Sequence, residues 1–208
     1  MIRLLASALL GIAFAAVLSL GSTSFGDTNP YASAVEMTFV TPLGAGHCSA
    51  VYLGHGYFLS AGHCADDIVK MSATDVKIEG HVVTVKSYDT IRDIAFFKTE
   101  EDKITIPVAK LNFSPLPVGE HVTIVGWPVD LGEVIGDGKI ASKIGPHGPW
   151  PVSNIVVAAV APGNSGGPVY NDKGEVVGIV VGMLGQTSIS IIIPVSVIAD
   201  VETFVVSQ

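Results

Sequence analysis

The stretch APGNSGGPV, residues 161–169, surrounds a single serine, Ser165, with three glycines and two prolines. Glycine adopts backbone angles that other residues avoid, and its missing side chain lets a ligand come close to the backbone. The serine is therefore either part of a tight turn or a nucleophile that needs space for its substrate. Because most serines in glycine-rich turns are only parts of turns, the rest of the sequence has to decide.

The pentapeptide GNSGG, residues 163–167, matches the G-x-S-x-G turn of α/β hydrolases. In that class the serine leads into a helix, and the histidine follows it later in the chain. Here no histidine follows Ser165, and the last one is His147. The apolar segment after the motif, residues 176–183, has the composition of a strand. Both observations argue against an α/β hydrolase.

Short apolar segments separated by Gly, Pro, Asn and Asp recur along the chain and predict strands. A helix is predicted only near the end, at residues 195–206, where Val197, Val201 and Phe204 have helical spacing. Many strands without helices between them predict an all-β fold of sandwich or barrel type. The predicted strands are residues 34–40, 48–53, 57–61, 75–80, 82–88, 94–98, 122–127, 154–160, 176–183 and 188–194.

The composition is that of a globular chain with a sizeable core. Of the 208 residues, 49% are hydrophobic and 14% are charged, which excludes a disordered chain. The formal net charge of −8 argues against nucleic acid and anionic membranes as partners. Pro115 and Pro117 in residues 111–120 mark a break between two lobes, about residues 31–114 and 118–195.

The N-terminal residues 1–26 differ in character from the rest. Arg3 is followed by an apolar run over residues 4–20 and then by small residues, which is the pattern of a secretory signal peptide. A retained N-terminal anchor is the alternative, because the run is close to the length that spans a bilayer. We expect an exported protein, secreted or periplasmic, that meets a membrane only if this segment is retained.

The chain has two cysteines, Cys48 and Cys64. An exported protein meets oxidising conditions, so a pair with no cysteine left over predicts one disulfide. The alternative is a metal site, because His47-Cys48 and His63-Cys64 repeat the same dipeptide. Zinc sites use short paired spacings such as CxxC and HxxxH, which are missing here. We therefore favour the disulfide and expect neither a metal nor an organic cofactor.

Three motifs carry residues suited to acyl transfer. SAGHC places His63 just after an apolar strand, and RDIAFF places Asp93 just before another. A serine hydroxyl needs an adjacent imidazole as base, and a buried carboxylate fixes the tautomer of that imidazole. Asp89 is a rival for the acid, and Asp93 is favoured because it directly precedes the apolar segment. Trp127 and Trp150 are expected to pack or to line a rim.

SAGHC, RDIAFF and PGNSGGP, in this order, resemble the motifs of the trypsin/chymotrypsin-like serine proteases over about residues 35–200. The second half is most similar to the HtrA/Deg branch and to related bacterial and viral peptidases. The resemblance implies two six-stranded antiparallel β-barrels with a short C-terminal helix, with residues 31–208 as the protease domain. It implies Ser165 as nucleophile, His63 as general base, Asp93 as its orienting acid, and the N–H groups of Gly163 and Ser165 as oxyanion hole. The pair Cys48–Cys64 would match the family's disulfide beside the catalytic histidine.

The chain departs from the family at two points. Asn164 precedes the serine where digestive enzymes have an aspartate that pairs with a newly cut N-terminus, so no such activation is expected. No PDZ domain is expected after the protease domain. The resemblance implies a substrate pocket without charge, lined by Ala159, Val160, Val181, Gly182, Met183 and Ser190. The sequence thus predicts a serine endopeptidase that cleaves proteins or peptides after small or apolar residues, with an inactive binding module of the same fold as the alternative.

Overall fold

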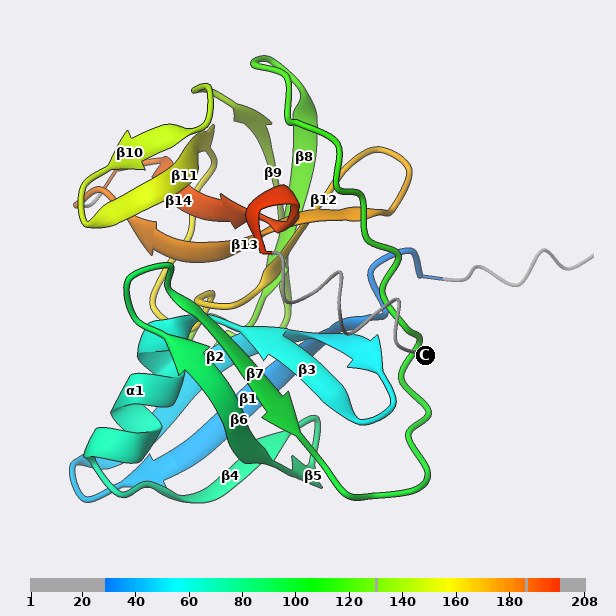
Figure 1. Ribbon diagram of the computed structural model, residues 1–208, viewed down its shortest axis with the longest axis vertical. Coiled ribbons are helices and arrows are strands. Elements are labelled where there is room, and N and C mark those ends of the chain that lie inside the picture. The colour runs from blue at the N-terminus through cyan, green and yellow to red at the C-terminus, as the bar shows by residue number, and fades with distance from the viewer. Residues whose placement is uncertain (1–28, 130, 186, 199–208) are drawn as a thin grey trace, which may run out of the picture.

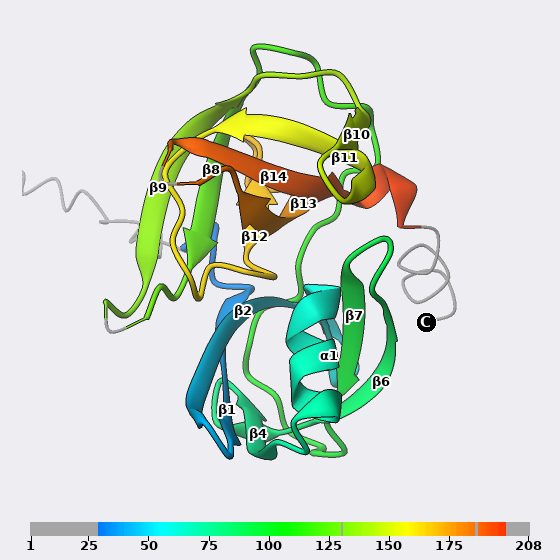
Figure 2. The same cartoon turned by 90° about the vertical axis from the view of Figure 1, so that its left-hand side faces the viewer.

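The computed structural model describes residues 29–129, 131–185 and 187–198. They form two lobes, each built on one antiparallel sheet of seven strands, which lie one above the other in Figures 1 and 2. The first lobe contains β1 (Ala34–Thr41), β2 (Gly44–Gly54), β3 (Tyr57–Ser60), α1 (Gly62–Lys70), β4 (Thr74–Ile78), β5 (His81–Val82), β6 (Thr84–Asp89) and β7 (Ile94–Lys98). The second contains β8 (His121–Gly126), β9 (Val134–Ile140), β10 (Gly145–His147), β11 (Trp150–Val157), β12 (Pro168–Tyr170), β13 (Val176–Met183), β14 (Ile189–Pro194) and the 3-10 turn η1 (Val195–Val197).

The predicted all-β fold with two lobes is confirmed. In the second lobe β9 pairs with both β8 and β11, so that β8, β9, β11, β12, β13 and β14 close into a ring. This ring is the six-stranded barrel expected from the sequence, and β10 is added outside it as a hairpin with β11.

The sheet of the first lobe has the order β5-β4-β1-β2-β3-β7-β6. It has one strand more than expected because the predicted strand 82–88 is divided. Val83 lies between β5, which pairs with β4, and β6, which pairs with β7. The buried Val83 therefore marks the point where the chain passes from one edge of the sheet to the other.

Helix α1 corrects the expectation that helices occur only near the C-terminus. Its buried residues, among them Cys64, Ala65 and Ile68, lie on one face, as in a short amphipathic helix. At the other end of the chain, the predicted helix 195–206 begins as the 3-10 turn η1, and its remainder lies outside the described residues. The predicted signal segment 1–26 also lies outside them.

One buried cluster extends from the first lobe into the second, and a separate cluster that includes Val122, Ile140 and Val156 lies within the second lobe. Val125, Tyr170 and Val181 of the second lobe belong to the same buried cluster as Val51 and Phe58 of the first. Residues 99–120 connect β7 to β8, and the predicted break at 111–120 lies in this segment. In the part of the chain that the structure describes, no helix is long and apolar enough to cross a membrane.

Candidate active site

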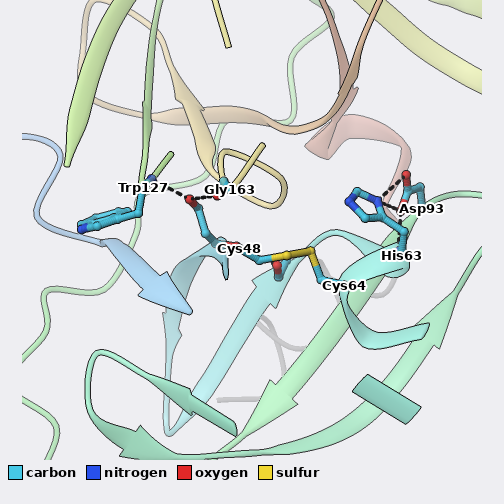
Figure 3. The surroundings of a disulfide bond; sticks show 8 residues. Cys48, His63, Cys64, Asp93, Trp127 and Gly163 are labelled. Atoms are coloured by element: carbon cyan, nitrogen blue, oxygen red, sulfur yellow. Dashed lines mark hydrogen bonds and ion pairs between the residues drawn. A yellow bond between two sulfur atoms is a disulfide. The ribbon is translucent and has the colours of Figure 1, made fainter. Parts of the chain in front are cut away.

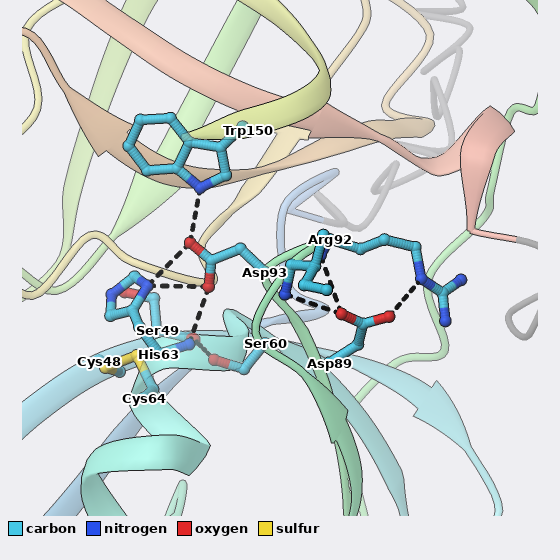
Figure 4. Close-up of polar contacts among 10 residues, drawn as sticks. Cys48, Ser49, Ser60, His63, Cys64, Asp89, Arg92, Asp93 and Trp150 are labelled. Carbon is cyan, nitrogen blue, oxygen red and sulfur yellow. Dashed lines mark hydrogen bonds and ion pairs between the residues drawn. A yellow bond between two sulfur atoms is a disulfide. The ribbon is translucent and has the colours of Figure 1, made fainter. Parts of the chain in front are cut away.

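His63 and Asp93 lie where helix α1 begins and strand β7 begins (Figure 4). Oδ1 of Asp93 accepts the backbone N–H of His63 at 2.8 Å, and Nδ1 of the ring lies 3.0 Å from Oδ1 and 3.1 Å from Oδ2. An ionised carboxylate only accepts hydrogen bonds, so the ring proton is assigned to Nδ1. Nε2 of His63 is then free to take up a proton.

The turn before β7 distinguishes Asp93 from its rival Asp89. Asp89 accepts the backbone N–H groups of Ile91 and Arg92 at 2.8 and 3.0 Å, and it pairs with Nε of Arg92 at 2.8 Å. These bonds hold the turn in which Asp93 takes a left-handed φ of 57°, a conformation that aspartate tolerates better than most residues. Asp93, rather than Asp89, is therefore the carboxylate that contacts His63.

The two groups shift the pKa values of one another. Burial raises the pKa of Asp93, but hydrogen bonds from His63, the charge of the imidazolium and a hydrogen bond from Trp150 outweigh it, so that the pKa lies below its ordinary value. Burial lowers the pKa of His63, but the hydrogen bond and charge of Asp93, with smaller contributions from Asp67 and Asp66, raise it above its ordinary value. Asp93 is thus ionised at neutral pH, and His63 is a stronger base than a free imidazole.

Ser165 and His63 line the same cavity, which has a volume of about 340 Å³. The cavity lies where the β1–β2 hairpin and α1 of the first lobe face residues 162–165 of the second. The Ser165 side chain makes no hydrogen bond with any residue that the structure describes. The other lining residues are Phe39, Thr41, Leu43, Gly44, Ala45, Gly46, His47, Cys48, Asp67, Met71, Pro162 and Gly163.

The backbone around Ser165 leaves two N–H groups unpaired. The carbonyl of Pro162 accepts the N–H of Val129 at 3.0 Å, and the carbonyl of Asn164 accepts the N–H of Gly167 at 2.9 Å. In a trans peptide the N–H points away from the preceding carbonyl, and no peptide in the described ranges is cis. The N–H groups of Gly163 and Ser165 therefore point away from these partners, and neither has an acceptor among the described residues.

Gly163 is required at its position for two reasons. Its φ of 102° is unfavourable for residues with a side chain. A Cβ atom there would also meet the carbonyl oxygen of Trp127 and lie 2.9 Å from Cα of Pro128. The sequence predicted that the missing side chain of Gly163 leaves space for a substrate. In the structure this space is on the side of residues 127–129 of the same lobe.

Ser49 of strand β2 holds this loop from the first lobe. Its hydroxyl donates to the carbonyl of Gly163 at 2.8 Å and accepts the backbone N–H of Trp127 at 2.9 Å. Its backbone N–H donates to the carbonyl of Ser165 at 2.7 Å. Figure 3 shows Gly163 and Trp127 facing the strand that also carries Cys48. One buried serine therefore fixes two carbonyl groups of the loop.

The predicted disulfide is present between Cys48 and Cys64 (Figure 3). Cys64 follows His63 in helix α1, and Cys48 precedes Ser49 in strand β2. The bond therefore connects the segment that carries the imidazole with the strand that supports the Ser165 loop. Within the described ranges no group of three or more His, Cys, Asp or Glu side chains is arranged to hold a metal ion.

Of the residues predicted to form the substrate pocket, Val181, Gly182 and Met183 lie on β13 and Ser190 lies on β14, whereas Ala159 and Val160 follow the end of β11. Val181 and Ser190 are buried, and the Ser190 hydroxyl is already bonded to the carbonyl of Ala158 at 2.7 Å. Gly182 is half-buried, as is Val160, whereas Met183 and Ala159 are exposed. None of the six lines the cavity that contains Ser165 and His63. The lining of a substrate pocket therefore stays a prediction.

Two residues of the site, Ser49 and Trp150, are not predicted from the sequence in the roles that the structure gives them. Ser49 carries no motif of its own, although it follows a cysteine that was singled out. Trp150, expected to pack or to line a rim, donates its indole N–H to Oδ2 of Asp93 at 2.8 Å.

Comparison with known proteins identifies the family of this chain. Residues 48–179 match the family described as trypsin-like peptidase domain. The chloroplastic protease Do-like 2 of Arabidopsis thaliana is 34% identical over 142 residues, which cover 63% of this chain and 23% of that protein. A probable periplasmic DegP-like serine endoprotease of Rhizobium meliloti is 33% identical over 155 residues, which cover 70% of this chain and 30% of that protein. The chain thus spans less than a third of the length of these relatives.

Solved structures share the fold at low sequence identity. The serine endoprotease of Yersinia pestis aligns with a TM-score of 0.69 and 22% identity, over 86% of this chain and 64% of that one. The active form of a protease from M. tuberculosis aligns with a TM-score of 0.70 and 19% identity, over 84% of this chain and 81% of that one. Together with the family match over residues 48–179, these likenesses show that the chain belongs to the family of trypsin-like peptidase domains, with HtrA- and DegP-like proteases among its relatives.

Proposed function

We propose that the protein is a serine endopeptidase with Ser165 as nucleophile, His63 as general base and Asp93 as the acid that orients His63. One observation carries the proposal. The imidazole held by buried Asp93 lines the same cavity of about 340 Å³ as Ser165 and Gly163. A base with a raised pKa, a serine in a glycine-rich loop and unpaired backbone N–H groups are the parts that acyl transfer requires.

The reaction proceeds in two acyl transfers. Nε2 of His63 takes the proton from Oγ of Ser165 while Oγ attacks the carbonyl carbon of the substrate. The imidazolium then gives this proton to the leaving amine, the C–N bond breaks, and an acyl-enzyme remains. Water, activated by the same imidazole, attacks the acyl group and releases the acid and the free serine. The structure describes no hydrogen bond between Oγ of Ser165 and Nε2 of His63 in the unliganded site. This hydrogen bond forms when substrate binds.

The unpaired N–H groups of Gly163 and Ser165 serve as the oxyanion hole. Negative charge develops on the substrate oxygen in the transition state, and donors fixed in advance stabilise it. The bonds that fix the neighbouring carbonyls of Pro162 and Asn164 support this role, because they keep both N–H groups free. Ser49 adds to the support by holding the carbonyls of Gly163 and Ser165.

Proteins are the proposed substrates. The relatives from Arabidopsis thaliana and Rhizobium meliloti are a protease and a probable endoprotease. The six residues predicted to line the pocket carry no charge, which favours small or apolar residues before the scissile bond. Because one relative is periplasmic and the other chloroplastic, we also propose that the protein works outside the cytoplasm, as its N-terminal sequence predicts.

Labelling with a fluorophosphonate probe tests the nucleophile. Oγ of an activated serine attacks phosphorus, the P–F bond breaks, fluoride leaves and the serine proton passes to the base. We expect one adduct, located on Ser165 by peptide mass mapping and absent from Ser165→Ala. Ser114→Ala, at an exposed serine far along the chain from the motif, should label like the wild type.

The absence of an adduct on folded wild-type protein would overturn the proposal. That result would favour the alternative of an inactive binding module with a protease fold. An adduct on another serine would retain an enzymatic function but remove Ser165 from its assigned role.

A further inference from the structure

Trp150 connects the second lobe to the carboxylate of the first. It is the first residue of β11 and lies opposite His147 in the β10–β11 hairpin. Its indole Nε1 donates to Oδ2 of Asp93 at 2.8 Å, and Figure 4 shows the ring directed at the carboxylate from the side opposite Ser60. The donor thus comes from 57 residues farther along the chain and from the other lobe.

The indole ring of Trp150 packs against Gly182 in strand β13. A Cβ atom at Gly182 would collide with Cη2 of Trp150 and would lie 2.8 Å from Cζ2. Gly182 also lies where the register of β13 against β14 shifts after Val180. The ring is therefore held between its own hairpin and a strand that has no side chain at the point of contact.

The hydrogen bonds of Asp93 show what the indole contributes. Oδ1 accepts the His63 backbone N–H at 2.8 Å and faces Nδ1 at 3.0 Å. Without Trp150, Oδ2 would keep only the contact of 3.1 Å with the same Nδ1. Asp93 is 5% exposed, so water is poorly placed to replace the lost donor, and a buried carboxylate oxygen without a partner is costly.

We propose that Trp150 is a positioning residue for Asp93, which fixes the carboxylate across the lobe boundary so that it holds His63 in one orientation. This inference rests on the proposed triad and adds a fourth member to it. The indole acts through Asp93 and does not contact His63 or the substrate in the proposed reaction.

The chemistry of the indole suits this role. An indole N–H is a donor and never an acceptor, so it favours the ionised carboxylate and cannot compete for the proton on Nδ1. Its hydrogen bond offsets part of the negative charge on Oδ2, so it also weakens the electrostatic attraction between Asp93 and the imidazolium of His63. Removing this donor leaves a more basic but less firmly oriented carboxylate.

Two substitutions test the role from opposite sides. Trp150→Phe keeps an aromatic ring over Gly182 and removes the donor, whereas Gly182→Ala keeps the donor and displaces the ring. We expect each to slow fluorophosphonate labelling of Ser165 about tenfold, the factor that corresponds to about 1.4 kcal/mol. In Trp150→Phe the pH at which labelling reaches half its maximum should also move upward, because the imidazolium is held more strongly. Tyr88→Phe, on the exposed side of β6, is the matched aromatic control and should change neither quantity.

A measurement on the unaltered protein remains valid if either variant fails to fold. The chain has two tryptophans, so a ¹⁵N-labelled sample gives two indole N–H resonances, which Trp127→Phe or Trp150→Phe assigns. We expect the Trp150 resonance to titrate with the same midpoint as the His63 ring, while the Trp127 resonance does not follow it. A Trp150 resonance that is indifferent to this titration would overturn the inference.

The outcomes separate this inference from the proposed function. If wild-type protein is labelled on Ser165 and Trp150→Phe is labelled equally fast with the same pH midpoint, the positioning role is wrong and the triad stands. If wild-type protein is not labelled at all, the proposed function fails, and the indole titration alone then decides whether Trp150 is bonded to Asp93.

Discussion

The two halves of the candidate active site are held in place by different means. On one side, His63 and Asp93 are joined to each other by hydrogen bonds between their own groups, and Trp150 adds a further side-chain donor. On the other side, Ser165 makes no side-chain hydrogen bond to any described residue, and its loop is fixed through backbone carbonyls. Ser49 binds two of these carbonyls.

This difference predicts two kinds of response to substitution. A change among charged side chains alters the proton affinity of His63, so it should shift the pH dependence of the reaction as well as its rate. A change in the support of a backbone loop alters the position of N–H donors that do not titrate. It should therefore lower the rate at every pH and leave the pH midpoint unchanged.

Asp93→Asn should have the largest effect. The amide preserves the size of the side chain but favours the wrong tautomer of His63, so turnover should fall about ten-thousand-fold. Since the charge and hydrogen bond of Asp93 raise the pKa of His63, the pH midpoint of the remaining labelling should move downward. Rates measured from pH 5 to 9 on folded variant protein would check both effects.

Asp75→Asn is the control for this charge removal. Asp75 pairs only with Lys77 among the described ion pairs, on an exposed part of β4, so rate and midpoint should equal those of the wild type. A variant Asp93→Asn that keeps wild-type turnover would show that the acid lies elsewhere and would remove the contrast between the two halves.

Gly163→Ala should disrupt the Ser165 loop, which is the other half of the candidate active site. The new Cβ meets the carbonyl oxygen of Trp127, so the loop must shift and the Gly163 N–H leaves its position. Loss of one oxyanion donor costs about a hundred- to a thousand-fold in turnover. Gly136→Ala in β9, where a Cβ has only one neighbour at 3.9 Å, is the matched control. A downward or upward shift of the pH midpoint in Gly163→Ala would contradict the proposed separation.

Removal of the disulfide tests the covalent link between the halves. Cys48 and Cys64 are 16 residues apart, and a closed loop of this length stabilises the fold by about 3 kcal/mol. The double variant Cys48→Ala/Cys64→Ala should lose about this amount in urea unfolding, while the pH midpoint of labelling stays in place. A loss below about 1 kcal/mol would show that packing around α1, rather than the bond, holds the two segments together.

The sequence predicted those parts of the site whose signal is local. The segments around His63 and Asp93 and the glycine-rich loop of Ser165 each occupy a few consecutive residues, and the pairing of Cys48 with Cys64 follows from their number and setting. Most strands of the core were predicted for the same reason, because apolar runs between turn residues can be read in short windows. Strands β9, β10 and the buried β12 were not predicted.

The missed features depend on partners that are far away in the chain. Ala61, the residue before helix α1, has no side chain that could cap the helix, and Asp93 instead accepts the backbone N–H of His63 in the first turn, 30 residues earlier in the chain. Trp150 finds its acceptor 57 residues away, and Ser49 finds Gly163 at a distance of 114 residues. Strand β9 was missed for a different reason, since its two glycines and exposed residues weaken the strand pattern.

Ser49→Ala should give the smallest effect and the sharpest comparison. The substitution removes the hydroxyl that donates to the Gly163 carbonyl and accepts the Trp127 N–H. Two buried backbone groups then lose a partner, which costs about 2 kcal/mol of stability, and labelling of Ser165 should slow about tenfold because the loop is less firmly held.

Ser87→Ala, at an exposed serine of β6, controls for the loss of a hydroxyl. The hydrogen bonds described for Ser49 do not involve Asp93 or the His63 ring, so the pH midpoint should match that of the wild type within error. A shifted midpoint would mean that the support of the Ser165 loop also sets the proton affinity of His63, and the two halves would then act as one network.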